Sequence, residues 1–310
     1  MKTTTKGIHH ITAISGNAKE NLNFYTQFLG LKLVKKTVNF DDPYTYHLYY
    51  ANETADPGTL LTFFPWEHIV KGIRGTGQAT EIQYSVPEGS FDFWLNRLKE
   101  HNILYNKPAQ RFDEEYLTIL DNDGLKSELV ISPEKDKRKP YTTDEVNENV
   151  AIRGFRNITL TLHNIDKTSK LLTDILGYKL KEEKVNRFRF INENSNEANY
   201  IDLVYAPGEQ RGQVAGGSVH HVAFRVKDDE EQMKLHEILS NAGYHITPQI
   251  DRKYFKSLYF REPGGVLFEI ATDPPGMTVD ESVEELGKSL RLPEMYESRR
   301  EEILKRLPEL

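Results

Sequence analysis

The sequence predicts an α+β fold made of four βαβββ units, each consisting of a strand, a helix and three further strands. Two internal repetitions support this prediction. The segment 28–33 reads Phe-Leu-Gly-Leu-Lys-Leu and returns at 175–180 as Ile-Leu-Gly-Tyr-Lys-Leu, and strands that open with a His-His pair occur at 9–10 and 220–221. Strand-type alternation and helix-type spacing of apolar residues also follow one another in the same order four times.

The first two units share this order. In the first unit, Gly30 is expected to end the helix in the left-handed conformation that glycine adopts readily. The first unit is predicted to contain the strand 9–15, the helix 18–29 and the strands 31–37, 45–50 and 59–64. The second is predicted to contain the strand 81–86, the helix 90–101 and strands near 105–112, 117–121 and 126–131.

The last two units repeat the pattern, again with a glycine after each helix. The third unit is predicted to contain the strand 157–162, the helix 165–176 and three strands, the last at 200–205. The fourth is predicted to contain the strand 220–226, the helix 229–242 and the strands 247–250, 257–261 and 266–271.

A polar segment with two prolines separates the two halves of the chain. We therefore expect an N-terminal domain of two units (1–132), a linker (133–150), a C-terminal domain of two units (151–276) and a helical tail (277–310). The tail is charged, with sparse leucine and isoleucine. It is expected to form one or two surface helices that pack on the body or on a neighbouring subunit, which leaves a homo-oligomer open.

The composition excludes several function classes. The net charge is −7 and no basic block is present, so neither nucleic acid nor a membrane surface is an expected partner. We find no apolar run long enough to span a membrane and no signal-peptide pattern. Cysteine is absent, which removes disulfides, thiolate metal sites and cysteine nucleophiles and fits a cytoplasmic protein.

Each βαβββ unit forms a half-open sheet whose concave face must be covered, so two units are expected to join into a cup. Inward positions of the first and fourth strands would form its floor. In chain order these are His10 and Thr62, Glu81 and Glu128, Asn157 and Asp202, and His221 and Glu269. Units one and four together supply two imidazoles and a carboxylate. We therefore predict two cup-shaped half-barrel pairs, unit one with unit four and unit two with unit three.

Two histidines and a carboxylate form the facial triad by which non-haem oxygenases hold Fe(II) while leaving positions open. We expect His10, His221 and Glu269 to be the ligands, and Mn(II) fits the same set. Because successive side chains of a strand alternate between faces, one imidazole of each His-His pair is expected on each face. In the second cup, a solvated remnant is expected rather than an oxygen-rich second metal site.

The stretch 258–269 contains Tyr259, a Glu-Pro-Gly turn at 262–264, and Glu269 ten residues after the tyrosine. This stretch resembles the signature of the extradiol ring-cleaving dioxygenases of the vicinal oxygen chelate superfamily. The segment Ala271–Gly276 is similar to the hydroquinone-type members. The resemblance covers His9 to Gly276 and implies an enzyme that opens the ring of a small hydroquinone-like diol with O2 as co-substrate. Degradation or detoxification of quinones would be its purpose.

Carried over by position, the resemblance implies roles for eight residues. Its metal ligands are His10, His221 and Glu269, its catalytic residues are Tyr259, Arg252 and His220, and its substrate contacts are His9 and Thr12. Catechol-cleaving members carry an acid–base histidine at the place where this chain has Arg252. An arginine stabilises anions as a donor and does not act as a base. The departure agrees with the hydroquinone branch and leaves the proton-handling residue open.

Two other functions stay open at this point. The first is a glyoxalase-type, metal-dependent isomerase or lyase, although that chemistry typically places a carboxylate or glutamine where this chain has Thr62. The second is a non-catalytic protein that binds a small aromatic molecule in the cup. The histidines outside the pattern are expected at the surface or the pocket rim, and they are His47, His68, His101, His163, His236 and His245.

Overall fold

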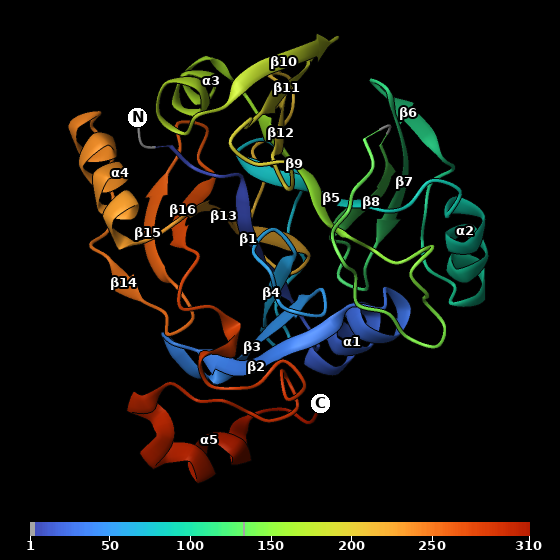
Figure 1. Cartoon of the computed structure of the whole chain (residues 1–310), viewed down its shortest axis with the longest axis vertical. Helices are drawn as coiled ribbons and strands as arrows, with labels where there is room; N and C mark the ends of the chain where they lie inside the picture. Colours follow the sequence, from blue (N-terminus) through green and yellow to red (C-terminus); the bar gives the residue numbers. More distant parts are fainter. Residues whose placement is uncertain (1–3, 133) are drawn as a thin grey trace.

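The computed structural model describes residues 4–132 and 134–310, and within these ranges its strands form two curled eight-stranded sheets (Figure 1). The first sheet has the order β14 (Ile250–Asp251), β15 (Lys256–Arg261), β16 (Leu267–Thr272), β13 (Ser218–Val226), β1 (Ile8–Ser15), β4 (Leu60–Pro65), β3 (Asp42–Ala51) and β2 (Lys32–Asn39). It joins unit one to unit four, as predicted from the ligand chemistry.

The second sheet joins unit two to unit three, which is also as predicted. Its order is β10 (Lys179–Lys184), β11 (Arg187–Ile191), β12 (Tyr200–Tyr205), β9 (Gly154–Leu162), β5 (Gln78–Ser85), β8 (Lys126–Ile131), β7 (Glu114–Leu120) and β6 (Ala109–Arg111). In both sheets the first strands of the two units pair antiparallel at the centre, β1 with β13 and β5 with β9.

The helices cover the sheets at the predicted places, with one systematic difference. α2 (Phe91–Glu100) and α4 (Asp229–Asn241) are regular α-helices, whereas α1 (Ala18–Asn23) and α3 (Asp166–Lys170) continue into π-helical turns at Phe24–Phe28 and Leu171–Ile175. The uninterrupted α-helices expected at 18–29 and 165–176 were therefore wrong in their second halves. The predicted strand 247–250 is likewise reduced to the two residues of β14.

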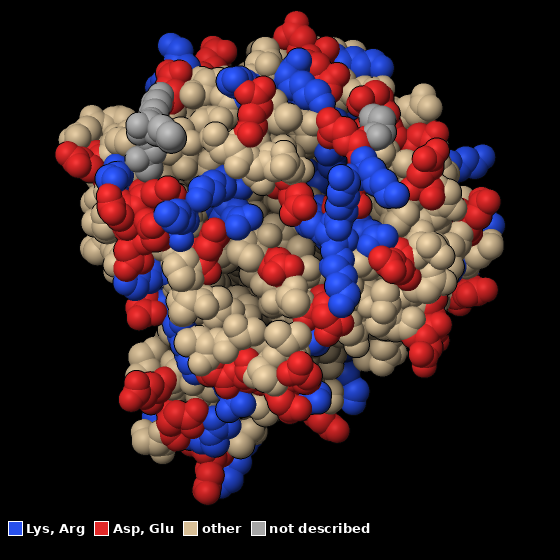
Figure 2. Space-filling view, in the orientation of Figure 1, with Lys and Arg blue, Asp and Glu red and all other residues tan. Residues whose placement is uncertain are grey.

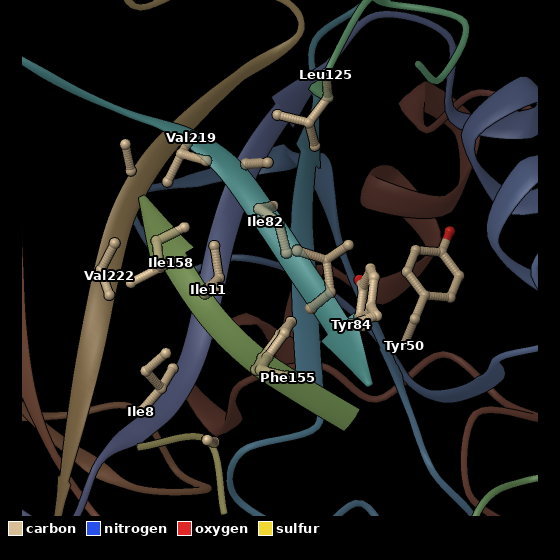
Figure 3. Close-up of a cluster of buried hydrophobic side chains, with 14 of the residues drawn as sticks. Ile8, Ile11, Tyr50, Ile82, Tyr84, Leu125, Phe155, Ile158, Val219 and Val222 are labelled. Carbon is tan, nitrogen blue, oxygen red and sulfur yellow. The ribbon is translucent and has the colours of Figure 1, made fainter. Parts of the chain in front are cut away.

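The main hydrophobic core lies between the two sheets, where their central strands pack against each other (Figure 3). It includes Ile8 and Ile11 of β1, Val219 and Val222 of β13, Ile82 and Tyr84 of β5, and Phe155 and Ile158 of β9. Because side chains of a strand alternate between faces, burying Ile11 in this core turns His10 and Thr12 toward the concave side of the first sheet.

The C-terminal tail packs on the two outer strands of unit one. It consists of the 3-10 turns η3 (Met277–Val279) and η4 (Glu294–Arg299) and the helix α5 (Arg300–Arg306), which lies beside β2 and β3 in Figure 1. The buried Lys35 ammonium of β2 binds the carboxylates of Asp280 and Glu281. The tail is thereby tied to the edge of the cup that holds His10.

The predicted linker begins at Pro133, which lies outside the described residues. Residues 134–150 form neither helix nor strand, but they are anchored, since Arg138 donates hydrogen bonds to the carbonyl oxygens of Gly58 and Phe155 at 3.0 and 2.8 Å. The domain limits remain a prediction. Across 4–132 and 134–310, no helix has the length and apolar character needed to cross a bilayer. Acidic and basic side chains are intermixed over the face in Figure 2.

Candidate metal centre

Three buried side chains converge on the floor of the first cup. His10 comes from β1, His221 from β13 and Glu269 from β16. The two Nε2 atoms are 3.2 Å apart, and Glu269 Oε2 lies 2.9 Å from His221 Nε2 and 3.3 Å from His10 Nε2. Among residues 4–132 and 134–310, this is the one group of three or more His, Asp and Glu side chains whose ligand atoms meet, all within 4.8 Å of one another.

The chemistry of these three groups fits a divalent metal ion. Glu269 Oε1 accepts a hydrogen bond from Ser257 at 2.5 Å, whereas the buried Oε2 has the Nε2 atoms of His10 and His221 as its neighbours. Burial alone would raise the pKa of Glu269, yet the neighbouring His10 and His221 hold it well below its usual range. Burial also lowers the pKa of His221. An ionised carboxylate and neutral imidazoles are the forms of these side chains that bind a metal.

Each ligand histidine follows directly on a β-bulge. The pairing of β1 with β13 skips His9 on one strand and His220 on the other, so that His10 pairs with Ala223 and Thr12 with His221. A bulge re-aims side chains out of regular alternation. As a result, His9 Nδ1 lies 3.0 Å from His10 Nδ1, and His220 Nδ1 lies 2.7 Å from His221 Nδ1. The expectation that each pair splits between the two faces was therefore wrong.

A cavity of about 260 Å³ opens beside His10 and His221, which form part of its lining. Its walls are mainly aromatic, with Phe40, Phe64, Trp66 and Phe255 around the imidazoles. Phe255 packs at 4.8 Å from the His10 ring, measured between ring centroids, and also covers His9 at 5.2 Å. These walls form an apolar slot that can hold a flat ring beside the metal ligands.

Tyr259 and Arg252 line this cavity on the wall formed by unit four. The Tyr259 ring lies 5.6 Å from the His221 ring, and burial raises the pKa of its hydroxyl, so it stays protonated and can donate a hydrogen bond. The Arg252 guanidinium lies 5.7 Å from the Tyr259 ring centroid and 3.3 Å from Asp41 Oδ2. His220 also lines the cavity, beside Phe64.

Two predicted substrate contacts lie behind the cavity wall instead. His9 is buried between His10 and Phe255, and Thr12 is fully buried, with its hydroxyl 2.8 Å from that of Thr62. Thr62 in turn is 2.9 Å from His47 Nε2. His9 and Thr12 therefore lie beside the candidate metal ligands and do not line the cavity.

His47 and Tyr49 of β3 also line the cavity; His47 was expected at the surface or the pocket rim, and Tyr49 was not singled out from the sequence. His47 is not a surface residue, because it is 8% exposed, and its Nδ1 is 3.0 Å from the Tyr49 hydroxyl. A usable signal was present in the sequence. In a strand, His47 and Tyr49 share one face, while Leu48 and Tyr50 face the core.

Comparison with known proteins agrees with this architecture. The family model of the Glyoxalase/Bleomycin resistance protein/Dioxygenase superfamily matches twice, over residues 7–129 and 154–270. The chain belongs to this superfamily. The vicinal oxygen chelate resemblance inferred from the 258–269 stretch is thereby confirmed.

Relatives within the superfamily match over nearly the whole chain. A Bacillus subtilis (strain 168) protein named "Putative ring-cleaving dioxygenase MhqO" is 46% identical over 98% of this chain and 96% of its own length. Chlorohydroquinone/hydroquinone 1,2-dioxygenase of Sphingobium indicum is 34% identical over 97% of this chain and 95% of its own. A crystal structure of a Bacillus subtilis protein titled a putative dioxygenase has a TM-score of 0.95 at 44% identity, covering 100% of this chain and 98% of that one.

The second cup of this superfamily member holds an ion-pair network. Its floor carboxylates Glu81, Glu128 and Asp202 are each bound by arginine or lysine, through Arg111, Lys126, Arg187 and Arg189. Arg111 forms a bidentate pair with Glu128 at 2.6 and 3.0 Å. The expectation of a solvated remnant was wrong. Carboxylates already neutralised in this way are not free to take up a metal ion.

Proposed function

We propose that this protein is a metal-dependent dioxygenase that opens the aromatic ring of hydroquinone-like substrates with O2. His10, His221 and Glu269 would hold Fe(II), with Mn(II) as the alternative ion. The convergence of these three ligands from the first and last units carries the proposal. Two imidazoles and one carboxylate are the donor set of non-haem iron oxygenases, and such a set leaves coordination positions open. Full-length relatives named as ring-cleaving and hydroquinone dioxygenases support it.

The residues around the cavity suit this reaction. Bound iron would act as a Lewis acid that lowers the pKa of a phenol and would give electrons a route from the ring to O2. The aromatic walls would orient the ring and exclude water from the reacting face. Tyr259, which stays protonated, would donate a hydrogen bond to an oxygen of the substrate, and Arg252 would stabilise negative charge that develops on it.

The size of the cavity favours substrates with one ring. Ligand pockets for drug-sized molecules commonly enclose about 300–1,000 Å³, and the cavity here has about 260 Å³. A monocyclic diol with a small substituent fits this space, whereas a substrate with two fused or linked rings would need the walls to move. Methyl- or chloro-substituted hydroquinones are therefore the substrate class that we propose.

The fourth floor position argues against the isomerase alternative. Thr62 stands where a glyoxalase-type site would carry a carboxylate or glutamine, and its hydroxyl is held between Thr12 and His47 at 2.8 and 2.9 Å. A threonine hydroxyl is a poor ligand and a poor base at neutral pH. The candidate ligand set therefore has one carboxylate, which suits oxygen chemistry better than proton abstraction and return.

The proposal is tested by anaerobic reconstitution with Fe(II), followed by oxygen-uptake measurements with 2-methylhydroquinone, hydroquinone and catechol. We expect oxygen consumption with the hydroquinones and opening of the ring in the product. His221→Ala should lose both bound iron and turnover. Full iron content and full rate in His221→Ala would refute the ligand assignment. Metal binding without oxygen uptake by any diol would point to the isomerase, and absence of metal binding to a binding protein.

A further inference from the structure

Four polar side chains form a hydrogen-bonded row across the first cup, starting beside the metal ligands. Thr12 of β1, opposite His221 in the strand pairing, contacts Thr62 of β4 at 2.8 Å between hydroxyl oxygens. Thr62 Oγ1 is 2.9 Å from His47 Nε2, and His47 Nδ1 is 3.0 Å from the Tyr49 hydroxyl. The row ends at Tyr49, which lines the cavity.

Strand order sets this row against the wall that carries Tyr259 and Arg252. β3, with His47 and Tyr49, and β15, with Tyr259, lie on opposite sides of the central β13–β1 pair. Because the sheet is curled into a cup, these two flanks face each other across the cavity. The two walls are also close enough to act on each other electrostatically, since Tyr259, Glu269 and Arg252 all influence the pKa of Tyr49.

The Tyr49 hydroxyl keeps hydrogen-bonding capacity that His47 does not use. A phenolic oxygen has one donor and two acceptor positions, and His47 occupies one of these in the described structure. If His47 Nδ1 accepts from Tyr49, the tyrosine oxygen can accept a hydrogen bond from a hydroxyl group of the ligand. If His47 Nδ1 donates, the Tyr49 hydroxyl can donate to the ligand. Burial lowers the pKa of His47, so the ring is neutral and can take either role.

We propose that Tyr49, positioned by His47 and Thr62, binds the second hydroxyl group of a para-diol. This inference rests on the proposed function and deepens it. In a para-diol the two oxygens stand at opposite ends of the ring, so a substrate bound to the metal through one oxygen presents the other to the far side of the cavity. A catechol has both oxygens on the same side and leaves Tyr49 without a partner on the ligand, so that its hydroxyl bonds to His47 alone.

The row therefore acts as a specificity element for para-diols over ortho-diols. With an ortho-diol the Tyr49 hydroxyl keeps its bond to His47 but faces an apolar ring edge, so the additional hydrogen bond that a para-diol would form is not made. Thr62 and His47 fix the position of that hydroxyl through bonds to neighbouring strands. Tyr49 contacts the ligand, while His47 and Thr62 are positioning residues.

A double-mutant cycle between protein and ligand tests this proposal. The Fe(II)-loaded protein is titrated anaerobically by calorimetry with hydroquinone and with phenol, which lacks only the second hydroxyl. Wild type should bind hydroquinone more tightly than phenol. Tyr49→Phe should weaken hydroquinone binding by about 2- to 10-fold, as expected for one hydrogen bond, and leave phenol binding unchanged. The proposal would be overturned if Tyr49→Phe weakened the binding of hydroquinone and of phenol equally, or if it weakened the binding of neither.

The neighbouring residue on the same strand provides the matched control. Tyr50 is equally buried but faces the core, where its hydroxyl donates to Asn21 at 2.9 Å. Tyr50→Phe should change neither affinity. Thr62→Val should weaken hydroquinone binding without affecting phenol, and Thr62→Ser should restore it. Should Tyr49→Phe fold poorly, this Thr62 pair decides the question, and a Thr62→Val protein with wild-type selectivity overturns the proposal.

Oxygen uptake by the wild type separates failure of this inference from failure of the proposed function. Turnover of hydroquinone without a Tyr49-dependent difference between hydroquinone and phenol refutes the hydroxyl site alone. A Tyr49-dependent difference in binding without any oxygen uptake refutes the dioxygenase function and leaves the binding site standing. Iron content is measured for every variant, so that loss of metal is not mistaken for loss of the hydrogen bond.

Discussion

The Nδ1 atom of His220 lies 2.7 Å from the Nδ1 atom of His221, its direct neighbour in β13. Two adjacent side chains of a regular strand point to opposite faces and cannot meet in this way. The bulge at His220, and the equivalent bulge at His9, bring the first histidine of each pair behind the second. Each ligand imidazole thus has a partner for the ring nitrogen that faces away from the metal position, and such partners orient metal ligands.

We predict that these bulge histidines control metal affinity. His9→Ala and His220→Ala should each weaken Fe(II) or Mn(II) binding by about 10- to 100-fold, the usual effect of removing the partner of a ligand histidine. The measurement is competition with a chelator of known affinity. His245→Ala, an exposed histidine, serves as the control. Metal affinities equal to that of His245→Ala would show that the Nδ1 contacts do not matter for binding.

We also predict that the metal stabilises the whole fold, because its ligands join the first and the last unit. At a free Mn(II) concentration 100 times the dissociation constant, the free energy of unfolding should rise by about 2.7 kcal/mol. Thermal unfolding with and without a chelator measures this change as a shift of several degrees in Tm. His221→Ala should lose the shift and His163→Ala, at an exposed position, should keep it. A shift that survives in His221→Ala would place the ion elsewhere.

A third prediction concerns the charge of Arg252. Arg252→Met should bind metal as wild type does, but its kcat/KM for hydroquinones should fall by about 10²- to 10³-fold, as for the loss of one donor to developing negative charge. Arg252→Lys should recover part of the rate. Oxygen-uptake kinetics and metal analysis together give the answer. Loss of metal in Arg252→Met would mean that the guanidinium supports the ligands rather than the reaction.

A fourth prediction concerns pH and stability at Asp121. Burial raises the pKa of this carboxyl to about 6, although Tyr25 and the Leu125 amide donate hydrogen bonds to it at 2.9 and 2.8 Å. Because the folded protein holds the proton more tightly than the unfolded chain, the contribution of Asp121 to stability is full below about pH 4 and is lost as pH rises through 6.

The Asp121→Asn variant should therefore become more stable relative to wild type as the pH rises. Its free energy of unfolding, minus that of wild type, should increase by about 3 kcal/mol between pH 4 and pH 7.5, which is the equivalent of a two-unit pKa shift. Urea unfolding at several pH values measures this difference. Parallel stability curves for the two proteins would mean that Asp121 is not destabilised in its ionised form.

A fifth prediction concerns the second cup, where Arg189 is 1% exposed and bound to Asp202 and Glu114 at 2.8 and 2.6 Å. Arg189→Met should lower the free energy of unfolding by about 3–5 kcal/mol, because it leaves buried carboxylates with less compensation. Lys179→Met removes an exposed pair and should cost less than about 1 kcal/mol. Chemical denaturation compares the two. The metal affinity of folded Arg189→Met should stay at the wild-type value. A small loss in the free energy of unfolding of Arg189→Met would mean that the ion pairs of the network are weakly coupled.

The sequence allowed the pairing of units to be predicted because the candidate metal ligands lie on the first and last strands of units one and four. Comparing these strands was enough to bring together His10, His221 and Glu269. It was not enough for residues of the middle strands. His47 and Tyr49 of β3, and Arg187 and Arg189 of β11, reach into the cups from strands that the comparison left out.

The structure differs from the sequence-based expectations in two further respects, and both depend on contacts that a single strand or helix does not reveal. A bulge is a relation between two strands, so the displaced position of His9 appears only when β1 is paired with β13. The apolar spacing of Phe24, Tyr25 and Phe28 fits an α-helix, and the wider turn is evident only from the hydrogen bond between the Leu29 amide and the Phe24 carbonyl oxygen at 3.0 Å.

His10 and His221 are separated by 211 positions in the sequence. This separation affects when the site can form during synthesis on the ribosome. A ribosome adds about 5–20 residues each second, so tens of seconds pass between the emergence of the first ligand and that of Glu269. β1 lacks its central neighbour β13 until residues 218–226 have been added, and the candidate set of metal ligands is incomplete until Glu269 has been made. A polypeptide that ends before residue 269 would therefore lack one of the three candidate ligands and could not carry out the metal-dependent reaction proposed above.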